Sequence, residues 1–369
     1  MFPPPTGTKV SREQVRELDD SFFSSDPLGY FLARVGSLVA SADGAKAHFD
    51  DGLGAELARL LHRRPEDMAR PSGSARELQV GVDALGLRQH AAEALIRLVD
   101  AILQLRSGEP GSASVWVTIA EGPTRTIDVL KRISSVPNGL HQDGVFAALV
   151  MPAEILSQVP SAPELQAALR TMAAWLEHAE ALLTRSDVHL SAAHNKIKHG
   201  LAVRPRDDAK ISVLTAGPPV QNGTTPVSAL DGAIDIFDQP FLEYLGRPPD
   251  EGHRKQGLEL TWLRLDTPTL LAETTMLATV YGSIFHVAAL NHASRSETAG
   301  PVPTYPTVPV GPTPDGLLGN SVTGMRFPVT LPPDGRKVDR SPGVGFNGGV
   351  FVPLRFDYAS GQTITLVEG

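Results

Sequence analysis

The densest group of side chains that could do chemistry lies in residues 186–203, SDVHLSAAHNKIKHGLAV. Asn195 precedes His199 by one helical turn, so on a helix the amide can orient the imidazole. An imidazole held in this way can accept or donate a proton near neutral pH. Lys198 and His194 add positive charge for an anionic substrate. These residue types at this spacing favour proton transfer beside a phosphate.

The flanking residues predict where this helix begins and ends. Ser186 is a suitable N-cap, Asp187 suits the first turn, and Gly200 suits the position that follows the last turn. Lys196 points to another face of the same helix and is a further candidate for binding substrate.

The segment His194–His199, HNKIKH, resembles a degenerate form of the motif of HEPN-domain proteins, in which an arginine precedes a histidine by a few residues. Asn195 and His199 match the motif, and His194 stands where the family has arginine. The resemblance implies a helical domain that cleaves RNA without a metal, and a homodimer with both motifs in one cleft. His199 would be the general acid or base, oriented by Asn195. The charge of His194 would depend on pH, unlike that of arginine.

A second polar stripe precedes the motif in the chain. His90, Glu93 and Arg97 share a face of a predicted helix at 75–106 and could bind substrate at the same site. Alternatively, the stripe is a solvated face with a Glu93–Arg97 ion pair. The motif residues, similarly, could only satisfy the polar end of a buried helix. The sequence leaves these alternatives open.

Metal and cofactor chemistry has little support in the sequence. His189, His194 and His199 recur at a spacing that turns each imidazole about 140° from the previous one, so three cannot bind one ion. The chain has no cysteine, which excludes disulfides and thiolate zinc sites. It also lacks the GxSxG, HExxH, Walker and dinucleotide-binding motifs. We expect no metal and no cofactor.

The composition is typical of a folded globular protein. The chain has 369 residues, of which 41% are hydrophobic, and a net charge of −8. This charge disfavours a surface that tracks nucleic acid throughout, although a local basic pocket can still bind RNA. Residues 1–14 lack the features of a signal peptide, and the uncharged stretch 274–290 is short for a membrane span. We expect a cytoplasmic protein with no membrane segment.

Periodicity predicts a mainly α fold, a helical bundle with a small β-containing insertion and a Pro/Gly-rich C-terminal tail. The predicted helices lie at 11–22, 28–41, 45–63, 75–106, 124–133, 161–184, 186–199 and 267–292. A capping box at Ser161 and an N-cap at Thr267 are expected to open two of them. Gly86 could break the fourth, and residues 114–120 are expected to be extended and to bury Trp116.

Composition shifts predict three parts. Residues 1–70 form an N-terminal helical subdomain, and 71–293 a HEPN-like helical core with a β insertion at 201–265. Residues 294–369 form an extended tail, either partly disordered or laid as strands on the body or on a partner chain. Two functions remain open. One is a HEPN-like protein, a dimer acting on RNA or a nucleotide as a metal-independent ribonuclease in a toxin or phage-defence setting. The other is a non-catalytic scaffold whose β insertion and tail bind a protein partner.

Overall fold

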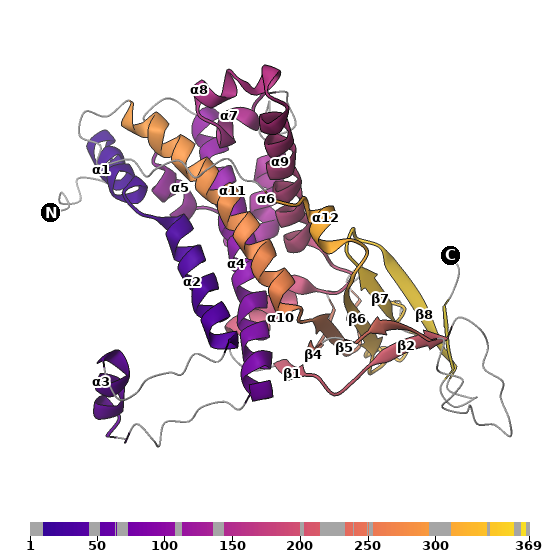
Figure 1. Cartoon of the computed structure of the whole chain (residues 1–369). Helices are drawn as coiled ribbons and strands as arrows, with labels where there is room; N and C mark the ends of the chain where they lie inside the picture. Colours follow the sequence, from indigo (N-terminus) through magenta and orange to yellow (C-terminus); the bar gives the residue numbers. More distant parts are fainter. Residues whose placement is uncertain are drawn as a thin grey trace, which may run out of the picture.

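A mostly helical body and an antiparallel sheet make up the chain in the computed structural model (Figure 1). The structure describes residues 10–43, 52–62, 64, 73–107, 113–135, 144–199, 203–214, 233–238, 240–248, 250, 254–294, 311–337, 340–357 and 363–366. The mainly helical character predicted from the sequence is confirmed. The β structure is larger than a small insertion.

The helices follow the predicted order closely. They are α1 (Arg12–Phe23), α2 (Pro27–Ala42), α3 (Gly52–Leu60), α4 (Gly73–Ser107), α5 (Val115–Ala120), α6 (Thr126–Ser135), α7 (Ala147–Val150), α8 (Ala153–Leu156), the 3-10 turn η2 (Val159–Ser161), α9 (Pro163–Thr184), α10 (Leu190–Lys198), α11 (Thr267–Ala293) and α12 (Pro314–Leu318). The long α4 runs unbroken through Gly86. Within the ranges given above, no helix has the length and apolar character needed to cross a bilayer.

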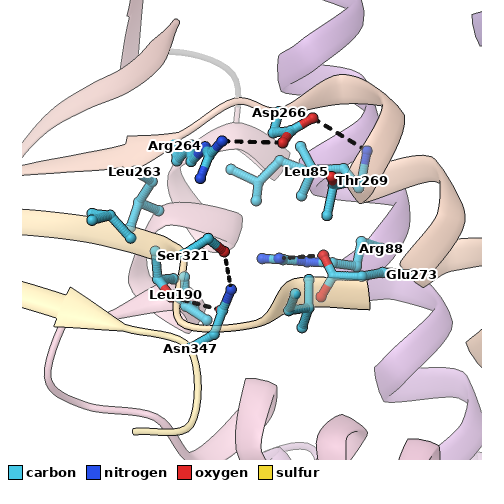
Figure 2. A pocket seen from close by; sticks show the side chains of 14 residues that line it. Leu85, Arg88, Leu190, Leu263, Arg264, Asp266, Thr269, Glu273, Ser321 and Asn347 are labelled. Atoms are coloured by element: carbon cyan, nitrogen blue, oxygen red, sulfur yellow. Dashed lines mark hydrogen bonds and ion pairs between the residues drawn. The ribbon is translucent and has the colours of Figure 1, made fainter. Parts of the chain in front are cut away.

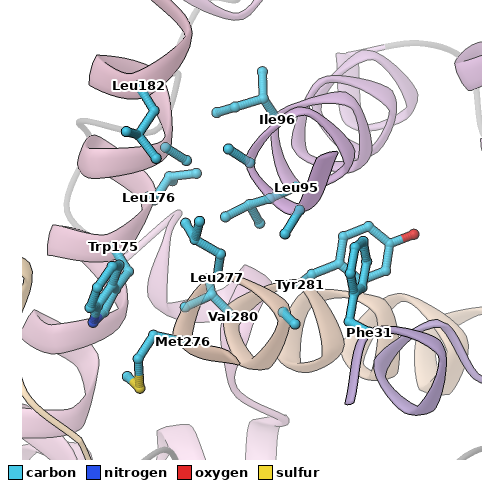
Figure 3. Close-up of a cluster of buried hydrophobic side chains, with 14 of the residues drawn as sticks. Phe31, Leu95, Ile96, Trp175, Leu176, Leu182, Met276, Leu277, Val280 and Tyr281 are labelled. Carbon is cyan, nitrogen blue, oxygen red and sulfur yellow. The ribbon is translucent and has the colours of Figure 1, made fainter. Parts of the chain in front are cut away.

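The core of the bundle lies where α2, α4, α9 and α11 meet (Figure 3). Ala91, Leu95 and Leu98, spaced four and three residues apart along α4, form an apolar stripe with no exposed surface. Leu277 of α11 and Trp175 of α9 are equally buried beside them. Close packing of this kind makes the bundle a rigid support for side chains on its surface.

Local caps set several helix ends, but two predicted caps are wrong. Ser11 opens α1 with a capping box that Gln14 completes. Asp266, not Thr267, caps α11 by accepting a hydrogen bond from the backbone N–H of Thr269. The capping box at Ser161 does not form, because α9 starts two residues later and Ser161 belongs to the preceding 3-10 turn.

The prediction of an extended segment at 114–120 is also wrong. Residues 115–120 form α5, and the Trp116 side chain is 40% exposed. Ser114 caps this helix at the backbone N–H of Val117 and donates its hydroxyl proton to Asp19 of α1, 2.5 Å away. A cap and a tertiary hydrogen bond therefore outweigh the strand propensity of the apolar residues.

The predicted insertion and tail contribute strands to one antiparallel sheet. Its order is β1-β4-β5-β6-β7-β8-β9, and β2 pairs separately with β3. The strands are β1 (Val203–Arg206), β2 (Ile211–Leu214), β3 (Ala233–Phe237), β4 (Phe241–Gly246), β5 (Glu259–Arg264), β6 (Val322–Pro328), β7 (Gly343–Phe346), β8 (Phe351–Asp357) and β9 (Thr363–Leu366). Because β5 pairs with β6, segments on either side of α11 join in a single sheet beside one end of the bundle (Figure 1).

Candidate functional site

The helix that carries the candidate motif, α10, begins later than the sequence predicts. Its N-cap is His189, which has a left-handed backbone (φ 48°) and makes no side-chain cap hydrogen bond. The predicted N-cap at Ser186 is therefore wrong, and Asp187 instead forms an ion pair with Arg185 at 2.6 Å. Gly200, the predicted C-terminal stop, lies outside the described residues.

The short connection from α9 to α10 is tied to the sheet by arginines. Arg326 of β6 donates to the backbone carbonyl of Asp187 at 2.7 Å. Arg340, just before β7, donates to the same carbonyl at 3.2 Å and to Nε2 of His189. Arg185 donates to the Phe346 carbonyl of β7 at 2.5 Å. The sheet thus orients the start of α10.

Charge is concentrated at this junction. Burial raises the pKa of Glu259, although Arg340 and Arg326 oppose the shift. Burial and the charge of Arg340 lower the pKa of Arg326 to about 10. Burial, followed by Arg340, also lowers the pKa of His189 to about 4. Because Arg340 is always a donor, His189 must be neutral to accept its hydrogen bond.

Asn195 and His199, the motif residues, both have exposed side chains. A backbone hydrogen bond joins the N–H of His199 to the carbonyl of Asn195 at 3.0 Å. Within the described residues no hydrogen bond joins their side chains, so the expected orientation of His199 by the amide is not formed in this chain. Lys196 lies elsewhere, with its ammonium 6.0 Å from the ring centre of Tyr244 on β4.

Other predicted residues do come together, across the contact of α10 with α4. The positive charge of His90 on α4 lowers the pKa of half-buried His194 on α10. The negative charge of Glu93 raises the pKa of each imidazole, and the positive charge of Lys198 lowers it. We call His90, Glu93, His194 and Lys198 the imidazole cluster. It combines two titratable bases, one carboxylate and one ammonium on two packed helices.

Burial is the largest influence on both imidazoles of this cluster and lowers the pKa of each. The Nδ1 atom of His194 is buried and has no hydrogen-bond partner in the described part of the chain. The ring of His90 stands edge-on to Phe31, with the ring centres 5.5 Å apart. Both imidazoles are therefore favoured in the neutral form, which can accept a proton.

Arg97 is held by the protein itself. It forms the predicted i, i+4 ion pair with Glu93 at 2.7 Å. Its other N–H groups donate to the carbonyls of Pro123 and Thr124 at 2.9 and 3.0 Å. With these partners Arg97 positions the Glu93 carboxylate beside the imidazoles, and its capacity to bind a substrate is reduced.

Sequence reasoning missed the contribution of α2 to this surface. Tyr30 is 46% exposed, and its ring stands edge-on to His90 with the centres 6.2 Å apart. The positive charge of Arg34 lowers the pKa of His90. Nothing in the apolar pattern of this helix links it to the motif, because the contact is made only in the folded chain.

The three histidines spaced along 189–199 face different surroundings. His189 meets Arg340, His194 faces α4, and His199 is exposed. Among the residues that the structure describes, no group of three or more His, Cys, Asp or Glu side chains is arranged to hold a metal ion.

Comparisons with known proteins give no relative for this chain. No protein-family model, curated protein or solved structure matches it. No function can therefore be transferred from a relative.

Proposed function

We propose that this protein is a HEPN-like, metal-independent ribonuclease that acts on RNA or a nucleotide through the imidazole cluster. The supporting observation is that α10, which carries His194 and Lys198, packs against α4, which carries His90 and Glu93. Glu93 and Lys198 therefore influence both imidazoles. Two imidazoles and an ammonium supply the base, the acid and the phosphate-binding charge that RNA cleavage needs. Cleavage of this kind needs no metal.

In the proposed reaction, neutral His194 takes the proton of a ribose 2′-hydroxyl. The 2′-oxygen then attacks the adjacent phosphorus, and the bond from phosphorus to the 5′-oxygen breaks. His90, protonated because the bound phosphate raises the pKa of its imidazole, gives its proton to the leaving oxygen. Lys198 stabilises the charge on the phosphate. The products are a 2′,3′-cyclic phosphate and a 5′-hydroxyl.

In a homodimer, the exposed motif residues could contribute to a shared site. Asn195 and His199 lie at the surface of α10, where a second copy could present the same helix. Paired α10 helices would bring a further imidazole and Lys196 near the substrate. A toxin or phage-defence role would suit such an enzyme.

The test is cleavage of single-stranded RNA in EDTA by purified protein. We expect His194→Ala and His90→Ala to lower the cleavage rate by about 10²–10⁴-fold. His62→Asn, a change at an exposed histidine at the end of α3, is the matched control and should cleave at the wild-type rate. Intact RNA with wild-type protein, or equal rates for wild type and both alanine variants, would overturn the proposal.

His194→Arg tests the HEPN resemblance separately. It restores the arginine of the family motif, whose charge does not depend on pH. If Lys198 and the arginine bind phosphate while His199 transfers protons, this variant should cleave at least as fast as wild type, and His199→Ala should abolish cleavage. If His194→Arg instead cleaves as slowly as His194→Ala, the imidazole of His194 is the general base.

A second candidate function, a non-catalytic scaffold, is favoured by apolar side chains on the outer face of α2. Leu32 and Val39 are each 43% exposed. We take the occupant of this face to be a second copy of the chain. Leu32→Lys with Val39→Lys should then dissociate oligomers in light scattering, whereas Val329→Lys, at another exposed apolar residue, should not. An unchanged mass would count against this candidate.

A further inference from the structure

A pocket lined by both apolar and polar side chains lies between the helical bundle and the sheet (Figure 2). Its cavity volume is about 40 Å³. Since one water needs about 10–15 Å³, the pocket has room for a few waters or one small group. The helices α4 and α11 form one side, and β5 with the start of β6 the other. Its polar lining includes Arg88, Glu273, Arg264, Asp266, Ser321 and Asn347.

Arg88 is the most deeply buried cation of this pocket, with 5% of the residue exposed. One of its terminal nitrogens donates to Glu273 at 2.9 Å. The second carboxylate oxygen of Glu273 lies 2.8 Å from Nε2 of His178. Both oxygens of Glu273 are thus engaged, and the guanidinium of Arg88 points across the pocket toward Ser321 (Figure 2).

The hydrogen-bonding groups still unused in the pocket are donors. The Nε atoms of Arg88 and Arg264 are buried and have no partner among the residues that the structure describes. Asp266 is occupied, because it accepts from a terminal nitrogen of Arg264 and from the backbone of Thr269. Ser321 Oγ already accepts from Asn347 at 2.5 Å, so its own proton is available to a ligand.

Buried donors of this kind need an acceptor, and donors on guanidinium groups bind charged oxygen most strongly. We propose that the pocket binds a small oxyanion, the phosphate or carboxylate group of a small molecule. The oxyanion accepts from Nε of Arg88, Nε of Arg264 and the Ser321 hydroxyl. This binding site goes beyond the proposed nuclease and is measured without RNA, so either can fail alone.

Thermal unfolding in added salts tests this site. Inorganic phosphate and acetate represent the two sources of the oxyanion, and potassium chloride at equal ionic strength is the reference. A ligand that binds only the folded state raises the midpoint, here by about 2 °C or more at ten times its Kd. A rise in phosphate alone assigns a phosphate group, and a rise in acetate alone a carboxylate. No rise beyond chloride in either salt overturns the proposal.

Variants locate the effect. Arg88→Lys keeps a cation beside Glu273 but removes the Nε donor, and Arg264→Lys does the same beside Asp266. Each should remove most of the anion-dependent rise while circular dichroism shows a folded protein. Arg125→Lys, at an exposed surface ion pair, is the matched control and should keep the full rise. If the rise persists in the Arg88→Lys, Arg264→Lys double variant, the anion binds elsewhere. Should that double variant be unfolded, Ser321→Ala replaces it as the test. Loss of most of the anion-dependent rise in Ser321→Ala supports the site, and the full rise overturns it.

Discussion

At the residue scale, His189 shows how one side chain links the candidate helix to the rest of the chain. Its left-handed backbone places the imidazole where Nε2 accepts a hydrogen bond from Arg340. Protonation would remove that acceptor and set two cations side by side. Histidine is tolerated here only as the neutral form.

This requirement predicts pH-dependent stability. The pKa of His189 falls from 6.5 to about 4 on folding, so the unfolded chain takes up the proton first. The stability it contributes, on the order of 3 kcal/mol, is complete above pH 6.5 and is lost as pH falls toward 4. Urea unfolding at several pH values measures it.

His189→Asn should flatten that pH dependence, since asparagine tolerates a left-handed backbone, offers an acceptor to Arg340 and does not titrate. His62→Asn is the matched control, because His62 also has a left-handed backbone (φ 51°) but is exposed. If the free energy of unfolding depends on pH equally in His189→Asn and wild type, a group other than His189 causes the dependence.

At the element scale, the close approach of β7 to the α9–α10 connection decides how the sheet meets the bundle. A Cβ at Gly345 would lie 2.7 Å from Oδ2 of Asp187 and 2.8 Å from Cγ1 of Val188. Glycine at this strand position therefore permits the contact that Arg185 and Arg340 then secure with hydrogen bonds.

Gly345→Ala should lower the free energy of unfolding by about 1–3 kcal/mol, because the added methyl group forces β7 away from the connection. Gly36→Ala is the matched change on the exposed face of α2, where a Cβ meets nothing within 4 Å. It should be neutral or stabilise by up to about 1 kcal/mol, since alanine favours helix. Chemical denaturation measures both values. Equal losses of unfolding free energy in Gly345→Ala and Gly36→Ala would contradict the close approach of β7 to the connection.

At the scale of the whole molecule, the C-terminal residues are part of the body. Strands β6 to β9 extend the sheet beyond β5, and Arg326 of β6 holds the entry to α10. The carbonyl of Pro312 accepts a hydrogen bond from the indole of Trp175 at 2.9 Å, which ties the same region to α9. Removing the tail is therefore a test of folding before it is a test of partner binding.

Ending the chain after residue 319 should abolish the single cooperative unfolding transition and cause aggregation, because β5 loses β6, keeps only β4 as a partner strand and becomes an exposed edge of the sheet. Ending it after residue 357 removes β9 alone and should preserve cooperative unfolding. Calorimetry compares the two. If the chain that ends after residue 319 is monomeric and unfolds cooperatively, the helical body is stable without β6 to β9.

The sequence by itself determined the helical body. The spacing of Ala91, Leu95 and Leu98 predicts the buried stripe of α4, and the N-cap expected at Thr267 lies within one residue of the observed cap, Asp266. Such signals are local, because helical periodicity and helix capping both depend on residues that are a few positions apart in the sequence.

Only the tertiary structure decided which distant groups meet. His90 and His194 belong to separate helical patterns, and their pairing depends on how α4 packs against α10. The pairing of β5 with β6 depends on a strand match across the whole of α11. Trp116, predicted to be buried, is exposed because Ser114 and Asp19 direct the chain into a helix. Contacts of this kind are set by three-dimensional packing, which no window of sequence contains.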